Sequence, residues 1–478
     1  MKAKYNYPTI QIGKPIADAM KIIDEYSMGI CFVFDNLVLV GLLTDGDIRR
    51  AIINGAKLTD CIESIVKKTF YSLGIDCTIE SIQRGLAKYK YIPIINESLH
   101  LVDVASSSSY HHIPLAKPVL TGNELEYVSD CITSGWISSQ GKYVNQFEDN
   151  FSKFIGANHA LAVSNGTVAL HLALVALGVG PGDEVIVPNL TFAAPVNAIL
   201  YVGATPVLID VEEDSMCINS RLAEAAINKR TKAIIVVHLY GYPANMKEIM
   251  MLSKKHNIYV VEDCAEAVGS RYENLHVGCF GDVGTFSFFG NKTITTGEGG
   301  MIVAKNEEIY NRAKILRDHG MSQNKRYWHD VVGYNYRLTN LQAAVGVAQL
   351  ERVEYFIERK LFSANEYSIR LKDLEFIKTP STAHGILNSY WMYTIVLDRD
   401  HVDLKKGLMD LLTANRIESR TVFYPLHLMP PYKKYKRLNE TYKVSNYLSE
   451  GGVCLPSSPQ NTEKDIDKVC NLIKDFFS

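Results

Sequence analysis

The 478-residue chain lacks an excess of charge of either sign, because its 50 lysines and arginines nearly balance its 52 aspartates and glutamates. A net charge of −2 gives no basis for binding nucleic acid or an anionic membrane surface. Long apolar runs are also missing: the most apolar helix candidate, residues 168–179, is too short to span a bilayer and contains His171. We therefore expect neither nucleic acid nor a membrane as a partner.

The chain also lacks the signatures of disulfides and of structural zinc. Its nine cysteines are odd in number and show no paired C-x-x-C spacing. This pattern predicts free thiols in a reducing compartment and no metal site. Residues 1–8 lack the apolar core of a signal peptide. We therefore expect a cytoplasmic protein without a bound metal.

The chain has a globular composition, with 47% hydrophobic and 21% charged residues, and enough length for two or three domains. A small polar run, residues 106–112, separates two patterned regions and predicts a linker. Upstream, residues 1–105 alternate short helical and strand-like patterns. Downstream, residues 339–357 have helical apolar spacing and predict one long packing helix.

The most informative segment is residues 284–300, where Lys292 follows a strand-like run with three phenylalanines and precedes threonines and glycines. This context can hold an amine on a rigid support, next to a loop that closes over a ligand. A partly desolvated amine loses its charge more easily, and only the neutral form attacks a carbonyl. A surface lysine in a glycine-rich turn is the simpler explanation for a lone lysine, so the hypothesis depends on other segments.

Three further segments supply groups that a phosphorylated, planar cofactor requires. Residues 160–177 predict a strand, a tight turn and a helix, whose N-terminal N–H groups can bind phosphate. Residues 258–263 predict a buried strand that ends in Asp263, which can pair with a protonated ring nitrogen. Phe192 follows another short strand and can stack on a planar ring. Taken singly, an ordinary helix cap also explains each of the first two segments, and a core phenylalanine is the simpler explanation of the third.

These groups occur in the chain order of the fold-type I enzymes that use pyridoxal 5′-phosphate (PLP). Residues 113–478 resemble the DegT/DnrJ/EryC1/StrS family of sugar aminotransferases. The resemblance implies PLP as the cofactor, a large mixed-sheet α/β domain at residues 113–355 and a smaller α/β domain at residues 356–478. The segments that carry the resemblance are residues 134–139, 164–167, 262–267, 286–300, 333–337 and 425–427.

The resemblance also implies the residues around the cofactor's ring. Lys292 would form the covalent bond to PLP and move the proton during catalysis. Asp263 would pair with the pyridinium nitrogen, and Phe192 would stack on the ring. Glu266 would lie near the ring hydroxyl, where many relatives have histidine or glutamine; a carboxylate there needs a proton or a screening partner.

At the phosphate end, the resemblance implies that the backbone of Gly166 and Thr167 and the hydroxyl of Ser287 hold the phosphate. Asn335 would reach the phosphate of the neighbouring subunit's cofactor. The enzyme would then be an obligatory homodimer or a higher oligomer.

Candidate substrate residues are basic or aromatic. A guanidinium fork suits a carboxylate, so Arg337 and Arg420 are candidates for binding glutamate, although both could equally serve in structural ion pairs. Lys142 is a candidate for the diphosphate of a sugar nucleotide, although a solvated surface charge is the simpler explanation. The other substrate candidates are Trp136, Ser138, Tyr327, Trp328 and His427.

Lysine at position 292 favours transamination, because related sugar dehydratases keep the fold but have histidine there. Residues 262–267, 287–300 and 325–330 resemble the branch of the family that makes GDP-perosamine. This implies transfer of an amino group from L-glutamate to C4 of GDP-4-keto-6-deoxy-D-mannose, for a surface polysaccharide such as the O-antigen of lipopolysaccharide. Two alternatives stay open: a UDP-linked 4-keto-6-deoxy-hexose or N-acetylhexosamine as the substrate, and a PLP-binding regulator without catalysis.

The upstream module resembles a pair of CBS motifs. Residues 29–43 predict a β-hairpin that is followed by a helix. Residues 41–47 match the ending of a CBS motif, which implies that Thr44 and Asp47 contact the ribose and phosphate of an adenine nucleotide. The second half lacks the Gly-x-x-Thr-x-x-Asp ending, so a purely structural or dimerising role is nearly as well supported.

Replacement of Lys292 by alanine is expected to abolish turnover, because the cofactor would lose its covalent attachment and the reaction its proton carrier. The visible absorbance of the lysine-bound cofactor should disappear with it, which a spectrum of the purified variant measures. A Lys292→Ala protein that keeps both properties would refute the assignment.

Overall fold

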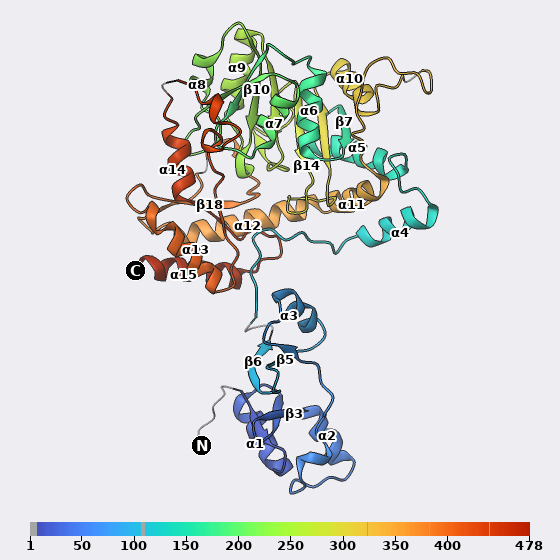
Figure 1. Ribbon diagram of the computed structural model, residues 1–478, viewed down its shortest axis with the longest axis vertical. Coiled ribbons are helices and arrows are strands. Elements are labelled where there is room, and N and C mark those ends of the chain that lie inside the picture. Colours follow the sequence, from blue (N-terminus) through green and yellow to red (C-terminus); the bar gives the residue numbers. More distant parts are fainter. Residues whose placement is uncertain (1–6, 107–109, 323, 382, 439) are drawn as a thin grey trace. The chain divides into compact units, whose positions relative to one another are not determined.

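The structure is a computed structural model that describes residues 7–106, 110–322, 324–381, 383–438 and 440–478 (Figure 1). The chain divides into two compact units, residues 1–112 and 113–478. No helix in the described parts of the chain combines the length and the apolar character that crossing a bilayer requires.

The first unit repeats one arrangement of three strands, and its first copy confirms the β-hairpin that residues 29–43 predict. In each copy the first strand is parallel to the second, and the second is antiparallel to the third. Both hairpins also shift register near their ends, at Val33/Phe34 and at Ile94/Ile95. The strands are β1 (Thr9–Gln11), β2 (Ile30–Asp35) and β3 (Val38–Thr44), then β4 (Leu73–Gly74), β5 (Tyr91–Ile95) and β6 (Leu101–Ser106).

Apolar side chains join the two copies. Phe32 and Phe34 of β2 share one buried cluster with Leu101 and Val104 of β6. The first copy has two helices, whereas the described residues of the second copy contain one. These helices are α1 (Ile16–Tyr26), α2 (Asp45–Ile53) and α3 (Ile79–Leu86).

The second unit is built on a seven-stranded sheet with the order β7-β15-β14-β11-β10-β8-β9. Strand β15 is antiparallel to both of its neighbours, and every pair from β14 to β9 is parallel. The parallel strands are almost continuously apolar, as expected when both faces are covered. The strands are β7 (His159–Val163), β8 (Glu184–Pro188), β9 (Thr205–Ile209), β10 (Thr231–Val237), β11 (Tyr259–Asp263), β14 (Val283–Ser287) and β15 (Gly300–Ala304).

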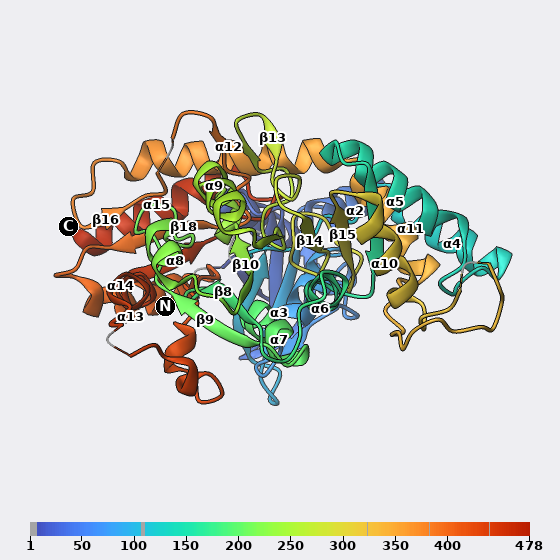
Figure 2. The same ribbon diagram turned by 90° about the horizontal axis from the view of Figure 1, so that it is seen from above.

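Helices cover both faces of this sheet (Figure 2). One face packs on α6, α7 and α10. The other face packs on α5 and α11 near β7, and on α8 and α9 near β9. The helices are α4 (Glu124–Ser134), α5 (Lys142–Ile155), α6 (Gly166–Ala176), α7 (Ala194–Tyr201), α8 (Ser220–Ala226), α9 (Met246–His256), α10 (Glu307–Arg317) and α11 (Asn340–Leu350).

The C-terminal part of the second unit contains an antiparallel four-stranded sheet, β16-β18-β20-β19. Its core is formed with α12, α13 and α15. The elements are α12 (Val353–Leu371), β16 (Ile377–Lys378), β18 (Tyr393–Leu397), α13 (Lys405–Ala414), β19 (Arg420–Thr421), α14 (Lys443–Gly451), β20 (Gly452–Leu455) and α15 (Glu463–Phe477). A small separate sheet contains β12 (Arg271–Tyr272), β13 (Leu275–His276) and β17 (Ile386–Leu387).

The single helix expected at residues 339–357 is wrong, because the chain breaks between α11 and α12. The two residues at the break bind other segments. The Glu351 carboxylate accepts hydrogen bonds from Asn123 and Tyr127, and Arg352 donates one to Thr121. These tertiary contacts redirect the chain although its apolar spacing continues.

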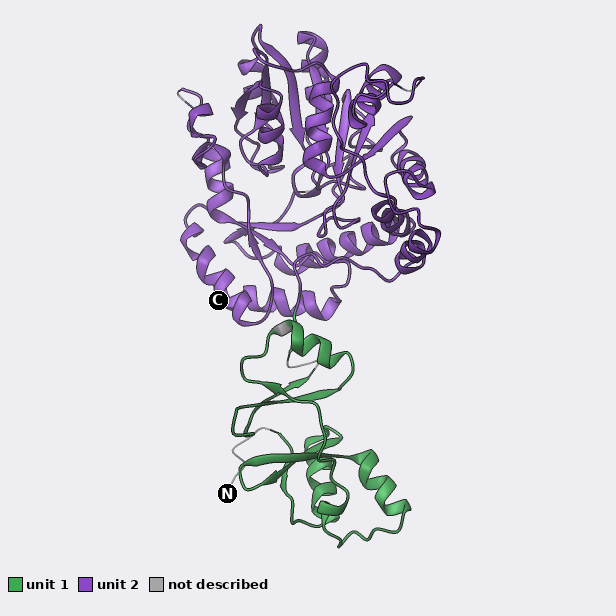
Figure 3. Ribbon diagram, turned by 45° about the vertical axis from the view of Figure 1, so that its right-hand side comes forward, with its two compact units in different colours: residues 1–112 green, residues 113–478 purple. Residues whose placement is uncertain are grey.

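The division of the chain falls between residues 112 and 113 (Figure 3). Ser106, which the sequence placed in the linker, is the last residue of β6. Residues 107–109 of the expected linker lie outside the described residues. Helix α12 runs across the expected boundary at residues 355 and 356, so a division into large and small domains at that point stays a prediction.

Candidate active site

A cavity of about 570 Å³ lies where the carboxyl ends of β7, β8, β10, β11 and β14 meet. Ligands bind to open α/β sheets at this edge, because the loops that follow the strands gather there. The C-terminal part of the unit completes the wall with Trp391, Arg420 and Phe423. The predicted cofactor residues that line the cavity are Gly166, Thr167, Phe192, Asp263, Glu266, Ser287 and Lys292.

The Lys292 amine is buried at the centre of this cavity. Its Nζ atom lies 3.5 Å from Oε1 of Glu266 and 3.7 Å from the ring centroid of Trp391. The indole N–H of Trp391 donates to the carbonyl of Asn291 at 2.8 Å, which fixes the backbone next to the lysine. Burial lowers the pKa of the amine, while the carboxylates of Glu266 and Asp263 oppose this effect.

Asp263 ends β11, and its carboxylate accepts a hydrogen bond from the backbone N–H of Ala265 at 3.0 Å. The pKa of this carboxyl is raised to about 6, mainly by burial and also by the nearby charge of Glu266, while the Ala265 hydrogen bond and Lys292 act in the opposite direction. A positive ring nitrogen beside Asp263 would favour the charged carboxylate in the same way as Lys292 does.

The other end of the cavity suits a phosphate. Helix α6 begins at Gly166, and its N-cap, Asn165, accepts a hydrogen bond from the N–H of Val168 at 2.9 Å. A Cβ atom at position 166 would lie 2.8 Å from Cβ of Ser287, so only glycine lets the helix start so close to β14. The free N–H groups of the first turn and the Ser287 hydroxyl therefore line one pocket for an anion.

The aromatic walls of the cavity favour a planar ligand. Phe192 is 59% exposed although it is a large apolar residue, and its ring lies 5.9 Å from that of Phe423. Tyr240 stacks on Phe423 with the ring centroids 5.5 Å apart. An apolar ring held open at a cavity is suited to stack on a bound ring.

Arg420 brings an uncommitted positive charge to the same cavity. Its Nε and Nη2 atoms have no hydrogen-bond partner among the described residues although both are buried. Its guanidinium lies 5.2 Å from the ring centroid of Trp391 and 5.5 Å from that of Phe423. Two buried guanidinium nitrogens without a partner are costly, which points to an anionic group of a ligand as their partner.

The structure separates the two arginine candidates. Arg337 is 2.7 Å from Asp318, and it also donates to the side chain of Asn335. It does not line the cavity of its own chain, and its expected role in binding glutamate stays a prediction. Asn335 is exposed and lies outside the cavity lining of its own chain.

Other substrate candidates also lie elsewhere. His427 is buried against Asn189 and stacks on Tyr442, with the ring centroids 4.5 Å apart, so it has a structural position. Tyr327 and Trp328 are exposed and are not in the cavity lining. The Ser138 carbonyl accepts the backbone N–H of Asn340, and its side chain lines neither this cavity nor the one that Trp136 and Lys142 line.

Trp136 and Lys142 line a second cavity, of about 610 Å³, beside α4 and α5. The Lys142 amine is paired with Asp130 at 2.9 Å, and Trp136 is largely exposed. Arg317 also lines this cavity but binds Glu148.

In the first unit, Thr44 and Asp47 bind each other at the start of α2. The Thr44 hydroxyl donates to Asp47 at 2.6 Å, and the two residues form a capping box. Asp47 also pairs with Arg50 and Lys67. A nucleotide at this position would compete with these contacts.

Sequence reasoning missed Trp391, whose ring centroid lies 3.7 Å from the Lys292 amine. Trp391 lies just before β18, and a tryptophan beside a strand has no local feature that distinguishes it from a core residue. It also missed the buried histidine, His238, which lies behind Asp263 and Glu266. Both roles depend on contacts between segments far apart in the chain.

The cavity offers a partner for each group of PLP. The Lys292 amine suits its aldehyde, and the Asp263 carboxylate suits its ring nitrogen. The aromatic wall suits the planar ring, and the anion pocket suits the phosphate. The fold and site define a PLP-dependent aminotransferase of fold type I. The chain belongs to the DegT/DnrJ/EryC1/StrS aminotransferase family, whose model matches residues 118–474. Residues 3–54 match the model of the CBS domain.

Comparisons with individual proteins support the same family. The chain is 46% identical over 366 residues to GDP-perosamine synthase from Vibrio cholerae, which covers 77% of this chain and 99% of that protein. The crystal structure of a family member from Brucella abortus matches with a TM-score of 0.71 at 32% identity, over 74% of this chain and 95% of that one. A Streptococcus pneumoniae chain, described as a sugar aminotransferase in its PLP form, matches with a TM-score of 0.72 at 28% identity. The match covers 76% of this chain and 98% of that one.

The affinity of the cofactor-free protein for PLP is expected to fall as the pH drops through about 6. The pKa of Asp263 is raised to about 6, so its carboxyl becomes neutral below that pH and no longer pairs with the ring nitrogen. Asp263→Asn should bind PLP weakly at every pH and without this titration. Fluorescence titrations of both proteins across this range measure the effect, and parallel pH profiles would contradict it.

Proposed function

We propose that this enzyme transfers the amino group of L-glutamate to C4 of GDP-4-keto-6-deoxy-D-mannose, which gives GDP-perosamine for a surface polysaccharide such as an O-antigen. The observation that supports this substrate is the 46% identity to a GDP-perosamine synthase across 99% of that protein's length. A UDP-linked 4-keto-6-deoxy sugar is the alternative substrate, because no motif of the chain identifies the base.

The residues of the cavity have different proposed roles toward PLP and the substrate. Bound PLP supplies an aldehyde and an electron-accepting ring. Lys292 would bond to the cofactor and, when freed from it, would move a proton at the reacting carbon of the substrate. Asp263 would keep the ring nitrogen charged, and Phe192 would cover the ring. The start of α6 and Ser287 would hold the phosphate.

Arg420 is the proposed partner of the glutamate carboxylate. It is the candidate arginine that lines the cavity, and its buried Nε and Nη2 atoms have no partner among the described residues. A guanidinium can bind a carboxylate through two parallel hydrogen bonds. Arg337 is held by Asp318 instead.

The sugar nucleotide needs a base contact and a cation for its diphosphate. Trp136 offers an exposed ring for stacking, and Lys142 offers a charge in the same cavity of about 610 Å³. These two residues stay the candidates for the nucleotide portion.

Oligomeric state and location follow from the same proposal. Asn335 is exposed and outside the cavity of its own chain, which is compatible with a contact to a neighbouring subunit's cofactor in a homodimer.

All nine cysteines are free thiols, which favours a reducing compartment such as the cytoplasm. For the first unit, an adenine nucleotide near Thr44 and Asp47 stays a proposal that the CBS match supports.

The function is tested by incubating the purified protein with PLP, glutamate and one keto-sugar nucleotide at a time. GDP-4-keto-6-deoxy-D-mannose should give the 4-amino product and an equal amount of 2-oxoglutarate, measured by mass spectrometry and a coupled assay. Amination of UDP-linked sugars alone would assign the alternative substrate. Loss of the cofactor's absorbance with glutamate, without recovery by any sugar, would favour a regulator.

Replacement of Arg420 by glutamine should raise the KM for glutamate about 10-fold to 100-fold, because a hydrogen bond to a charged group contributes about 1.5–3 kcal/mol. The KM for the sugar nucleotide should change little. Arg337→Gln is the matched comparison and should leave the glutamate KM near the wild-type value. The reverse pattern would assign the carboxylate to Arg337.

A further inference from the structure

The Lys292 amine has one carboxylate partner within ion-pair distance among the described residues. Oε1 of Glu266 lies 3.5 Å from Nζ, and both side chains are buried, with 6% and 12% of their surface exposed. Asp263 acts on the amine only at longer range. Glu266 therefore touches the atom that reacts with the cofactor.

The second oxygen of Glu266 is fixed by the backbone. Oε2 accepts the N–H of Tyr240 at 2.9 Å. Tyr240 is buried and has a φ of 53°, a left-handed conformation that non-glycine residues adopt at a cost. A strained residue in a buried turn is thus used to aim one N–H group at this carboxylate.

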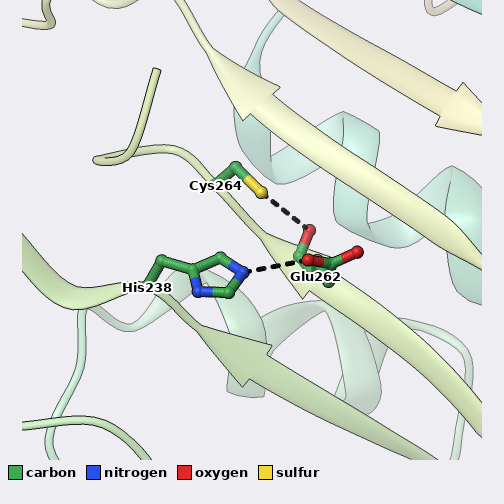
Figure 4. Close-up of side chains that lie close together, drawn as sticks. All are labelled: His238, Glu262 and Cys264. Carbon is green, nitrogen blue, oxygen red and sulfur yellow. Dashed lines mark hydrogen bonds and ion pairs between the residues drawn. The ribbon is translucent and has the colours of Figure 1, made fainter. Parts of the chain in front are cut away.

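His238 holds the turn that contains Tyr240. Its Nδ1 atom accepts the N–H of Ala244 at 3.0 Å, so its Nε2 atom carries the hydrogen and donates to Glu262 at 3.2 Å. Figure 4 shows His238 and Glu262 facing each other across the ends of adjacent strands, β10 and β11. The backbone N–H of His238 also donates to the carbonyl of Asp263.

Residues His238, Glu262 and Cys264 are of types that bind metals, and they lie close together (Figure 4). The Glu262 carboxylate, however, already accepts four hydrogen bonds. Besides His238, its donors are the backbone N–H groups of Gly278, Phe280 and Gly281. The cluster therefore supports the turn behind the active site, and its oxygen atoms are not available as ligands.

We propose that Glu266 is a catalytic residue, which accepts the proton of the Lys292 ammonium before the amine attacks the cofactor and returns it when the lysine is released. In this step the ammonium and the carboxylate become a neutral amine and a neutral carboxylic acid, so charge and protons balance. The neutral amine would then add to the aldehyde carbon of PLP, and the aldehyde oxygen would leave as water. This role needs the bond between Lys292 and PLP but does not depend on the proposed sugar.

Two consequences distinguish this role from a structural one. The negative charge of Glu266 favours the ammonium, so its removal should let the amine become neutral at lower pH. The proton acceptor is lost at the same time, so attachment should also become slower. Glutamine keeps an oxygen for the N–H of Tyr240, so the turn should stay intact in Glu266→Gln.

The test measures the rate constant for PLP attachment to the cofactor-free protein, from visible absorbance, across a range of pH. The midpoint of the test is the pH at which the rate constant reaches half of its maximum. In Glu266→Gln this midpoint should move to lower pH by about 1–3 units, and the maximal rate constant should fall about 100-fold or more. Glu298→Gln is the matched control: it removes the same charge from the lining of the same cavity but from a residue without an ion pair to Lys292 among the described residues. Its midpoint should equal that of the wild type.

A second variant guards against misfolding of the first. Glu266→Asp keeps the charge but shortens the side chain, so its midpoint should lie between those of the wild type and Glu266→Gln. An unchanged midpoint in Glu266→Gln, or an equal shift in Glu298→Gln, would overturn the proposal. If Glu266→Gln does not fold, a wild-type midpoint in Glu266→Asp overturns it. A wild-type protein that attaches no PLP would overturn the cofactor bond and this proposal together.

Discussion

One buried amine between two carboxylates is the constraint on which the second unit depends. Burial lowers the pKa of Lys292, the charges of Glu266 and Asp263 oppose that effect, and Arg420 adds to it. The amine therefore gives up its proton more readily than an exposed lysine does. A transaminase lysine must be charged in one step and neutral in the next, and a lowered pKa makes the neutral form easier to reach.

The sheet makes this arrangement rigid. Asp263 ends β11, and Lys292 follows β14, its hydrogen-bonded neighbour. Ser287, at the end of β14, lies so close to Gly166 that the phosphate pocket is part of the same core. The network through His238 and Glu262 then fixes the turn that positions Glu266. Fixed charges of this kind need no reorganisation when the reaction proceeds.

Much of this site could be predicted from the sequence, because the apolar run of each strand ends directly before or at a functional residue. Asp263 and Lys292 follow strongly apolar runs, and the helix start at Gly166 follows another. What could not be predicted depends on contacts between distant segments. Arg337 and Arg420 have similar local settings, and only the fold shows that Asp318 binds the first. His427 lies in a shared motif yet is buried against Asn189. The break after Leu350 arises from tertiary bonds of Glu351.

The covalent bond between Lys292 and the cofactor is tested most directly by reduction of the holoenzyme with borohydride, followed by proteolysis and mass spectrometry. Reduction converts that bond into a stable pyridoxyl adduct on the lysine that held the cofactor. The structure predicts one modified peptide, with the adduct on Lys292. An adduct on another lysine, or a PLP-saturated protein without any adduct, would contradict it.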